Sequence, residues 1–294
     1  MSRSPFFFGA RAGSRGALRR TLRCGALLGL VLALVSAPLA AETVTVAVAA
    51  NFVTPLQALA AEFESASGHE LTAVPGSTGQ LYAQIVNGAP FDVLLAADQE
   101  RPRRLVDEGR ADRASLFTYA VGRLVLWTRD PEFRAGLALE TLRRDDYRWL
   151  AIAQPDLAPY GAAARQVLRE MSLWEALQGR IVFGPNIGQT FAMAETGNAE
   201  LALVALSQAL AYDGEAAHVV VPPELHEPIR QDAVLLTRAT GNRAAVEFLA
   251  FLESPDAEKI IERFGYLSEP NRNASPSSRS AQRGLRKWRM PQAR

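Results

Sequence analysis

Two turns in this chain have the residue types best suited to binding a small anion. Residues 75–80 form a hydroxyl-bearing turn, Pro-Gly-Ser-Thr-Gly-Gln, which leads into a helical pattern and has no charged side chain. Such a turn directs free backbone N–H groups, hydroxyls and the positive end of a helix dipole to one place. A second turn, Ala50-Asn51, joins the apolar run 43–49 to another helical pattern. These two uncharged helix starts predict that an oxyanion is bound.

Two further turns of this kind follow later β-type runs, at Pro159-Tyr160 and at Asn186-Ile187. Strands of an open α/β sheet bring their following loops to one edge, where ligands bind. None of the four turns contains a basic residue. Fixed N–H and O–H donors suit a dehydrated tetrahedral oxyanion, because they can match its size and oxygen positions.

Each of these positions also has a simpler explanation when it is taken alone. Asn51, Ser77 and Thr78 are ordinary helix-capping residues. Tyr160 follows a proline and is equally explained as an aromatic side chain packed in a turn, and sequence alone does not judge the backbone at Ile187. Their joint recurrence after strands is what favours a binding site.

The segment between Glu42 and Pro270 alternates β-type runs with helical stretches, which predicts an α/β fold. Strands are expected at 43–49, 70–74, 91–97, 149–153, 181–183, 199–206 and 233–236, with an extended run at 117–128. Helices are expected at 55–65, 81–86, 101–109, 162–177, 242–252 and 256–264. The alternation runs through one α/β unit, then a second, and then back to the first.

A chain that crosses twice between two units forms two lobes with a cleft and two hinge strands. The predicted lobe I comprises residues 42–122 and 231–268, and the predicted lobe II comprises residues 123–230. The ligand is expected in the cleft between the lobes.

Residues 1–41 have the features of an export signal. Six arginines and no acid come first, an apolar run of about eleven residues follows at 25–35, and small residues at 36–41 suit cleavage near Ala40 or Ala41. The apolar run is too short to span a bilayer of roughly 30 Å at about 1.5 Å per residue. We therefore expect a periplasmic protein. Its mature form has no cysteine, because Cys24 lies in the signal, so disulfides and thiolate chemistry are excluded.

Charge is distributed unevenly along the chain. Of 32 basic residues, 6 lie in residues 1–41 and 7 follow Pro270, whereas all 31 acidic residues lie between, so that this central segment has a formal charge of −12. Such a segment argues against a nucleic-acid partner, since phosphate backbones are held mainly by Lys and Arg. Residues 269–294 are predicted to be a disordered basic tail.

Eight segments resemble the periplasmic molybdate-binding proteins of ABC transporters, which are type II periplasmic binding proteins. They are residues 45–52, 76–85, 87–93, 96–98, 117–122, 158–161, 197–201 and 228–234, and the resemblance covers essentially Glu42 to Leu267. It implies a monomer that captures molybdate or tungstate and delivers it to a membrane permease, with no cofactor and no catalysis.

Carried over position by position, the resemblance implies a set of ligand contacts. These are the loop of Ala50 and Asn51, Thr78 with Ser77 beside it, Tyr160, and the backbone amide of Ile187. One branch of the family has serine at the position of Asn51 and a late tyrosine, which aligns with Ala205 here. The other branch, with Ala-Asn and Pro-Tyr-Gly, implies that Tyr160 replaces that hydroxyl.

Two alternatives remain from the residues themselves. An enzyme of similar fold is disfavoured, because serine-esterase and phosphate-loop motifs are absent and the three histidines lack metal spacing. We expect His69 to face water, and Asp92, Asp98 and Asp232 to have structural roles rather than acid–base roles. The other alternative keeps the fold and changes the ligand to sulfate, phosphate or a small organic acid.

Overall fold

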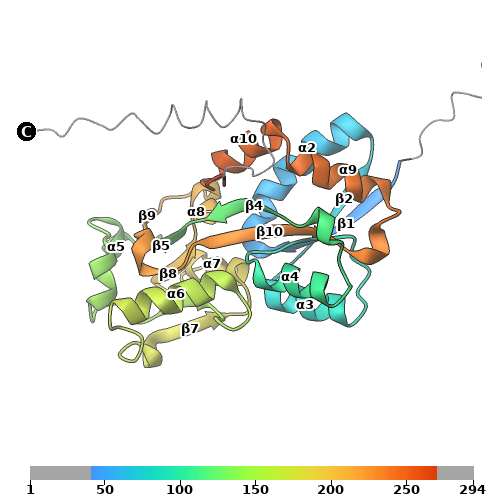
Figure 1. Ribbon diagram of the computed structural model, residues 1–294. Coiled ribbons are helices and arrows are strands. Elements are labelled where there is room, and N and C mark those ends of the chain that lie inside the picture. The colour runs from blue at the N-terminus through green and yellow to red at the C-terminus, as the bar shows by residue number, and fades with distance from the viewer. Residues whose placement is uncertain (1–40, 270–294) are drawn as a thin grey trace, which may run out of the picture. The chain divides into compact units, whose positions relative to one another are not determined.

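The chain forms two five-stranded sheets flanked by helices in a computed structural model that describes residues 41–269 (Figure 1). The predicted export signal and the predicted basic tail therefore lie outside the described residues, apart from Ala41 and Glu269. The predicted α/β fold with two lobes is confirmed. No helix within residues 41–269 is long and apolar enough to cross a membrane.

Lobe I is built on a mixed sheet with the strand order β2-β1-β3-β10-β4. Its strands are β1 Thr43–Ala49, β2 Glu70–Gly76, β3 Val93–Leu95, β4 Phe117–Gly122 and β10 Ile229–Leu235. Strand β1 pairs in parallel with β2 and β3, and β10 runs antiparallel between β3 and β4. The ends of β1 and β2 therefore deliver the turns at Asn51 and Ser77 to the same edge.

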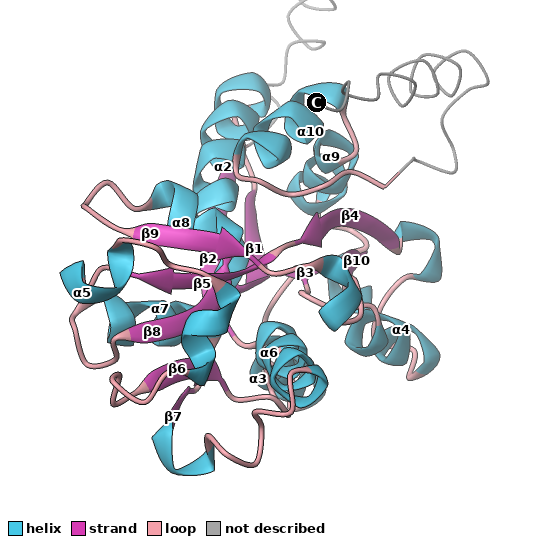
Figure 2. Cartoon of the chain, turned by 90° about the vertical axis from the view of Figure 1, so that its left-hand side faces the viewer, coloured by secondary structure: helices cyan, strands magenta, loops and turns pink. Residues whose placement is uncertain are grey.

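Helices cover both faces of this sheet because its strands are apolar on both sides (Figure 2). They are α2 Val53–Ser67, α3 Thr78–Val86, α4 Glu100–Asp107, α9 Arg243–Leu252 and α10 Pro255–Arg263. Val46 and Val48 pack with the cluster that includes Phe52 and Phe248, while Ala47 packs with Leu81 on the opposite face. This alternation anchors α2 on one face and α3 on the other, directly beyond the two strand ends.

Lobe II repeats the plan with the strand order β7-β6-β8-β5-β9. Its strands are β5 Leu124–Thr128, β6 Leu150–Ala153, β7 Ile181–Gly184, β8 Leu201–Ala205 and β9 Ala217–Val220. Its helices are α5 Pro131–Arg134, α6 Pro159–Glu170, α7 Ile187–Glu195 and α8 Leu206–Ala211. Strands β6 and β7 are parallel, so the turns at Tyr160 and Ile187 share one edge.

The chain passes between the lobes at two places. Strand β4 ends at Gly122 in the first sheet and β5 begins at Leu124 in the second, so the extended run predicted at 117–128 is two strands separated at Arg123. The return lies between β9 and β10.

Several boundaries differ from the sequence prediction. Helix α6 begins at Pro159 and ends at Glu170, because proline suits the first helical position and Ser172 adopts a left-handed φ of 58°. Strand β9 and helix α8 were not predicted. His69, expected to face water, is 4% exposed, and its Nδ1 accepts a hydrogen bond from the Glu42 amide at 3.1 Å.

Candidate functional site

A small cavity between the lobes brings together five of the six predicted ligand residues. Its lining consists of Ala49, Asn51, Gly76, Ser77, Thr78, Ala97, Ala158, Pro159, Tyr160 and Ile187. Among the described residues, those that line the cavity include no Asp, Glu, Lys, Arg or His. The cavity is small, with a volume of about 10 Å³ in this conformation.

Four helix starts surround this cavity. They belong to the short 3₁₀ helix η1 Ala50–Phe52 that leads into α2, and to α3, α6 and α7. The first amides of a helix have no acceptor within the helix, and they carry the positive end of its dipole. In α7 the capping side chain of Asn186 accepts from the Gln189 amide at 2.9 Å. The cap therefore does not use the Ile187 amide. The cavity is thus positive without a cation.

The Thr78 hydroxyl is oriented as a donor. Its Oγ1 accepts a hydrogen bond from the Ala97 amide at 3.0 Å, and the residue is fully buried. Ser77 is similar, because its Oγ accepts from the Gln80 amide at 3.3 Å as part of a capping box. A hydroxyl that already accepts from an amide has its own hydrogen available. Both hydroxyls can therefore donate to an anion.

Tyr160 comes from the second lobe and is 1% exposed. Its hydroxyl oxygen accepts from Nε2 of Gln231 at 3.3 Å, so its own hydrogen is left for another acceptor, and the Tyr266 hydroxyl is one within reach. Burial, followed by the neighbouring Tyr266 and Tyr119, raises the pKa of Tyr160 well above its ordinary value. The side chain consequently stays protonated, as a donor requires, through neutral and mildly alkaline pH.

Asn51 differs from this pattern. Its side-chain Nδ2 donates to Oε1 of Gln231 and to the Tyr266 hydroxyl, each at 2.9 Å. Its Oδ1 is buried without a hydrogen-bond partner within residues 41–269. Only the backbone amide of Asn51 is therefore arranged as a donor here.

Ala50 is the predicted ligand residue that does not line the cavity. It is half-buried, and its Cβ lies 3.4 Å from the place that a Cβ on Gly188 of the second lobe would occupy. Ala205 is fully buried at the start of α8, and its amide donates to Oε1 of Gln208. Position 205 therefore has no tyrosine hydroxyl, and the tyrosine that lines the cavity is Tyr160 on α6.

Three further residues of the site were missed by sequence reasoning. Gln231, Tyr266 and Ser207 form a buried network with Asn51, in which Ser207 Oγ and the Tyr266 hydroxyl donate to the Asn51 carbonyl at 2.9 and 2.8 Å. A signal existed for Gln231, because it belongs to the segment 228–234 that carries part of the family resemblance. For Ser207 and Tyr266 nothing in the local pattern distinguished them from capping and core residues.

The two lobes are in contact in this structure. The Gly79 amide donates to the Leu157 carbonyl at 2.9 Å, and Arg101 Nη2 donates to the Asp156 carbonyl at 3.0 Å. Lobe I contributes Gly79 and Arg101, and lobe II contributes Leu157 and Asp156. The cavity is therefore seen in a closed arrangement.

Replacing Gly79 with alanine should weaken ligand binding by hindering this closed arrangement. An added Cβ would lie 3.0 Å from the Leu157 carbonyl oxygen and 3.1 Å from its Cα, which are backbone atoms that cannot rotate away. We expect about a tenfold loss of affinity, equivalent to roughly 1.4 kcal/mol, measured by calorimetry. The melting temperature of the ligand-free protein should change little, and an unchanged affinity would show that this contact does not matter for closure.

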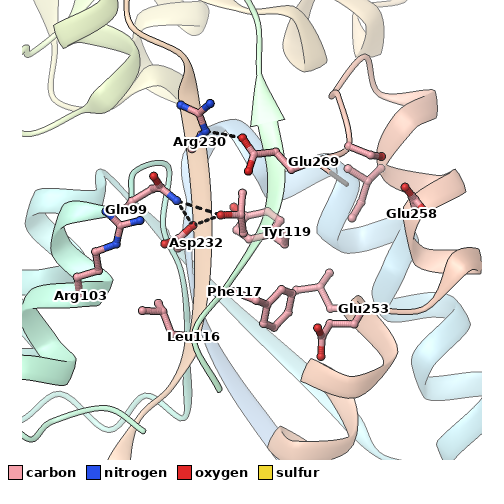
Figure 3. A pocket seen from close by; sticks show the side chains of 14 residues that line it. Gln99, Arg103, Leu116, Phe117, Tyr119, Arg230, Asp232, Glu253, Glu258 and Glu269 are labelled. Atoms are coloured by element: carbon pink, nitrogen blue, oxygen red, sulfur yellow. Dashed lines mark hydrogen bonds and ion pairs between the residues drawn. The ribbon is translucent and has the colours of Figure 1, made fainter. Parts of the chain in front are cut away.

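A larger cavity of about 440 Å³ lies on lobe I, away from the predicted residues (Figure 3). Its charged lining is mostly acidic, with Asp232, Glu253, Glu258 and Glu269 against Arg103 and Arg230. Arg230 also pairs with Glu269. An acidic surface repels an anion, so the smaller neutral cavity is the better candidate.

The acidic residues considered for catalysis have structural contacts. Asp92 accepts from the Thr45 amide at 2.8 Å and pairs with Arg238, and Asp98 accepts from the Arg101 amide at the start of α4. Asp232 accepts from Gln99 and Thr118. No group of three or more His, Cys, Asp or Glu side chains within the described part of the chain could hold a metal ion.

Known proteins with similar sequences share this plan. The family of bacterial extracellular solute-binding proteins matches residues 44–267. The molybdate-binding protein ModA of Rhodobacter capsulatus is 45% identical over 253 residues, which is 85% of this chain and 98% of that protein. ModA of Azotobacter vinelandii is also 45% identical, over 77% of this chain and 90% of that protein.

Solved structures agree with these sequence relatives. The periplasmic molybdate-binding protein of Azotobacter vinelandii superposes with a TM-score of 0.72 at 37% identity, covering 77% of this chain and all of that one. A sulfate-binding protein of Mycobacterium tuberculosis shares the fold alone, with a TM-score of 0.65 at 15% identity, covering 83% of this chain and 91% of that one. These relatives are solute-binding proteins and not enzymes. The chain therefore belongs to the family of bacterial extracellular solute-binding proteins.

Proposed function

We propose that this protein captures molybdate, and also tungstate, in the periplasm and delivers it to the membrane permease of an ABC importer. The observation that carries the proposal is the small uncharged cavity between the lobes, which is surrounded by helix starts and by hydroxyls oriented as donors. The two relatives at 45% identity are molybdate-binding proteins, which supports the same ligand here. The protein acts as a monomer without a cofactor, and binding involves no chemical change of the ligand.

Binding proceeds in two steps under this proposal. The anion first meets the lobe I donors at Asn51, Ser77 and Thr78, and closure then adds Tyr160 and the Ile187 amide. Each hydrogen bond to a charged oxyanion in a closed site contributes about 1.5–3 kcal/mol. Hydrogen bonds and helix dipoles at the site thus offset the repulsion between the anion and the negatively charged segment between Glu42 and Pro270.

The lining also distinguishes between anions. Phosphate is partly protonated at neutral pH and would need an acceptor such as a carboxylate, while a carboxylate ligand usually needs an arginine. Neither side chain is among the described residues that line the cavity. Sulfate has the same charge as molybdate but shorter bonds, so donors placed for the larger ion would leave some hydrogen bonds unmade.

Titration calorimetry with molybdate, tungstate, sulfate and phosphate tests the proposal. We expect molybdate and tungstate to bind with similar affinity. Sulfate should bind at least about 100-fold more weakly than molybdate, since losing two hydrogen bonds to a charged ligand costs about 3 kcal/mol or more. Molybdate should also raise the melting temperature, because it binds only the folded state. Tighter binding of sulfate or phosphate than of molybdate would contradict the assignment.

A further inference from the structure

We propose that Gln231 is a positioning residue that presents the Tyr160 hydroxyl hydrogen to the bound oxyanion. The inference rests on the proposed function, because it assigns a role at the same site. Gln231 lies on β10 of lobe I and is fully buried. Its Nε2 donates to the Tyr160 hydroxyl of lobe II at 3.3 Å.

The orientation of the Gln231 amide is set by its other end. Oε1 accepts from Asn51 Nδ2 at 2.9 Å and from the Tyr119 hydroxyl at 3.0 Å. With two donors on Oε1, the amide nitrogen is turned to Tyr160. A hydroxyl has one hydrogen, so a tyrosine oxygen that accepts from Gln231 keeps that hydrogen for another acceptor. In this structure the Tyr266 hydroxyl is an acceptor within its reach, and an anion in the cavity that Tyr160 lines would take the place of Tyr266.

The unpartnered oxygen of Asn51 shows what this orientation excludes. If Asn51 alone turned its amide over, its Oδ1 would face Oε1 of Gln231, two acceptors at the present distance of 2.9 Å. If both amides turned over, Asn51 Oδ1 would gain a donor, but Tyr160 would then have to donate to Gln231. As long as Gln231 is hydrogen-bonded to both Asn51 and Tyr160, only one of these two side chains can donate to the anion. The observed arrangement favours Tyr160 and leaves Asn51 Oδ1 without a partner within residues 41–269.

Gly122, where the chain crosses between the lobes, leaves space for the contact between Gln231 and Tyr160. Gly122 ends β4, and a Cβ added there would lie 2.1 Å from the Tyr160 hydroxyl and 2.7 Å from Gln231 Nε2. Any larger residue would displace one of the two side chains. The glycine and the amide together define the place of the Tyr160 hydroxyl.

The substitution Gln231→Glu tests the role of the amide hydrogens at nearly constant shape. The ionised carboxylate accepts from Tyr160 and so removes its hydrogen from the anion, and it also adds a negative charge. The protonated carboxyl can donate to Tyr160 as the amide does. Burial disfavours the ionised form, so protonation occurs within reach of mildly acidic buffers. Molybdate affinity of the variant should be about tenfold or more below wild type at pH 8 and should recover as the pH falls to about 5.5.

The matched control is Gln166→Glu on α6, which makes the same change on an exposed contact. Gln166 Oε1 accepts from the Glu227 amide at 2.9 Å, and a carboxylate keeps that hydrogen bond. Its affinity should follow wild type, with less than about a twofold change over the same pH range. A Gln231→Glu variant that also follows wild type at every pH would overturn the proposal.

A double-mutant cycle separates action through Tyr160 from a general packing role. Gln231→Met removes the donor without adding charge, and Tyr160→Phe removes the hydroxyl. If Gln231 acts through Tyr160, the double variant should bind molybdate about as well as Tyr160→Phe alone. Additive losses, or a Tyr160→Phe variant that binds like wild type, would refute the inference and favour the other amide orientation. Failure of the wild-type protein to bind molybdate would instead refute the proposed function.

Discussion

Replacing Thr78 with valine should weaken molybdate binding by about 10- to 150-fold, the equivalent of roughly 1.5–3 kcal/mol for one hydrogen bond to a charged ligand. Valine keeps the shape of threonine and removes the hydroxyl. The Ala97 amide, which donates to Thr78 Oγ1 at 3.0 Å, would also lose its acceptor in a buried place. Calorimetry gives the affinity, and thermal unfolding of the ligand-free protein gives the accompanying loss of stability.

Thr78→Ser is the matched control for this change. Serine keeps an oxygen that accepts from Ala97 and a hydrogen that donates to the ligand, so most of the affinity should remain. Similar losses for valine and serine would point to the methyl group rather than the hydroxyl. Wild-type affinity in Thr78→Val would remove Thr78 from the site.

Replacing Gly161 with alanine should have the largest effect on stability. An added Cβ would lie 2.1 Å from the Ala153 carbonyl oxygen and 2.6 Å from its carbon, at the end of β6. Because these are backbone atoms, the first turn of α6 must move away from the sheet. Overpacking of this kind costs about 1–3 kcal/mol or more, and each kcal/mol lowers the melting temperature by about 2–4 °C for a chain of this size. Affinity should fall as well, since Tyr160 lies in the displaced turn.

Gly179→Ala is the control for the glycine change itself. The space around its ideal Cβ is empty within 4 Å. Alanine at such a position restricts the unfolded chain, so the melting temperature should be unchanged or slightly raised. A Gly161→Ala variant as stable as Gly179→Ala would show that α6 can shift at no cost, and it would contradict the close packing on β6.

The site shows how an acidic protein can hold an anion. The residues described at the cavity provide dipoles and hydrogens rather than charges. Each hydroxyl among them is oriented by a backbone amide or by Gln231, which means that the fold determines the direction of its hydrogen. The binding energy then depends on geometry, and small changes in the supporting contacts should be felt at the ligand.

The α/β plan and the positions of the four turns could be predicted from the residues alone. Period-two and helical patterns are local, so β1, α2 and β2 could be predicted closely. Helix α2 ends at Gly68, which has a left-handed φ of 73°. The uncharged turns at Asn51, Ser77, Tyr160 and Ile187 were also visible. Local chemistry is enough to show that such a turn can bind an anion.

Which groups face the cavity, and in which role, depends on contacts between distant parts of the chain. Sheet order brings residues from opposite ends of the chain together, so Gln231 contacts Asn51 across 180 positions and Tyr160 across 71. No local pattern specifies that Asn51 Nδ2 donates to Gln231 and Tyr266 while the Tyr160 hydroxyl accepts from Gln231. The physical reason is that a hydrogen bond has a direction, and that direction is set by partners which only the folded chain brings within reach.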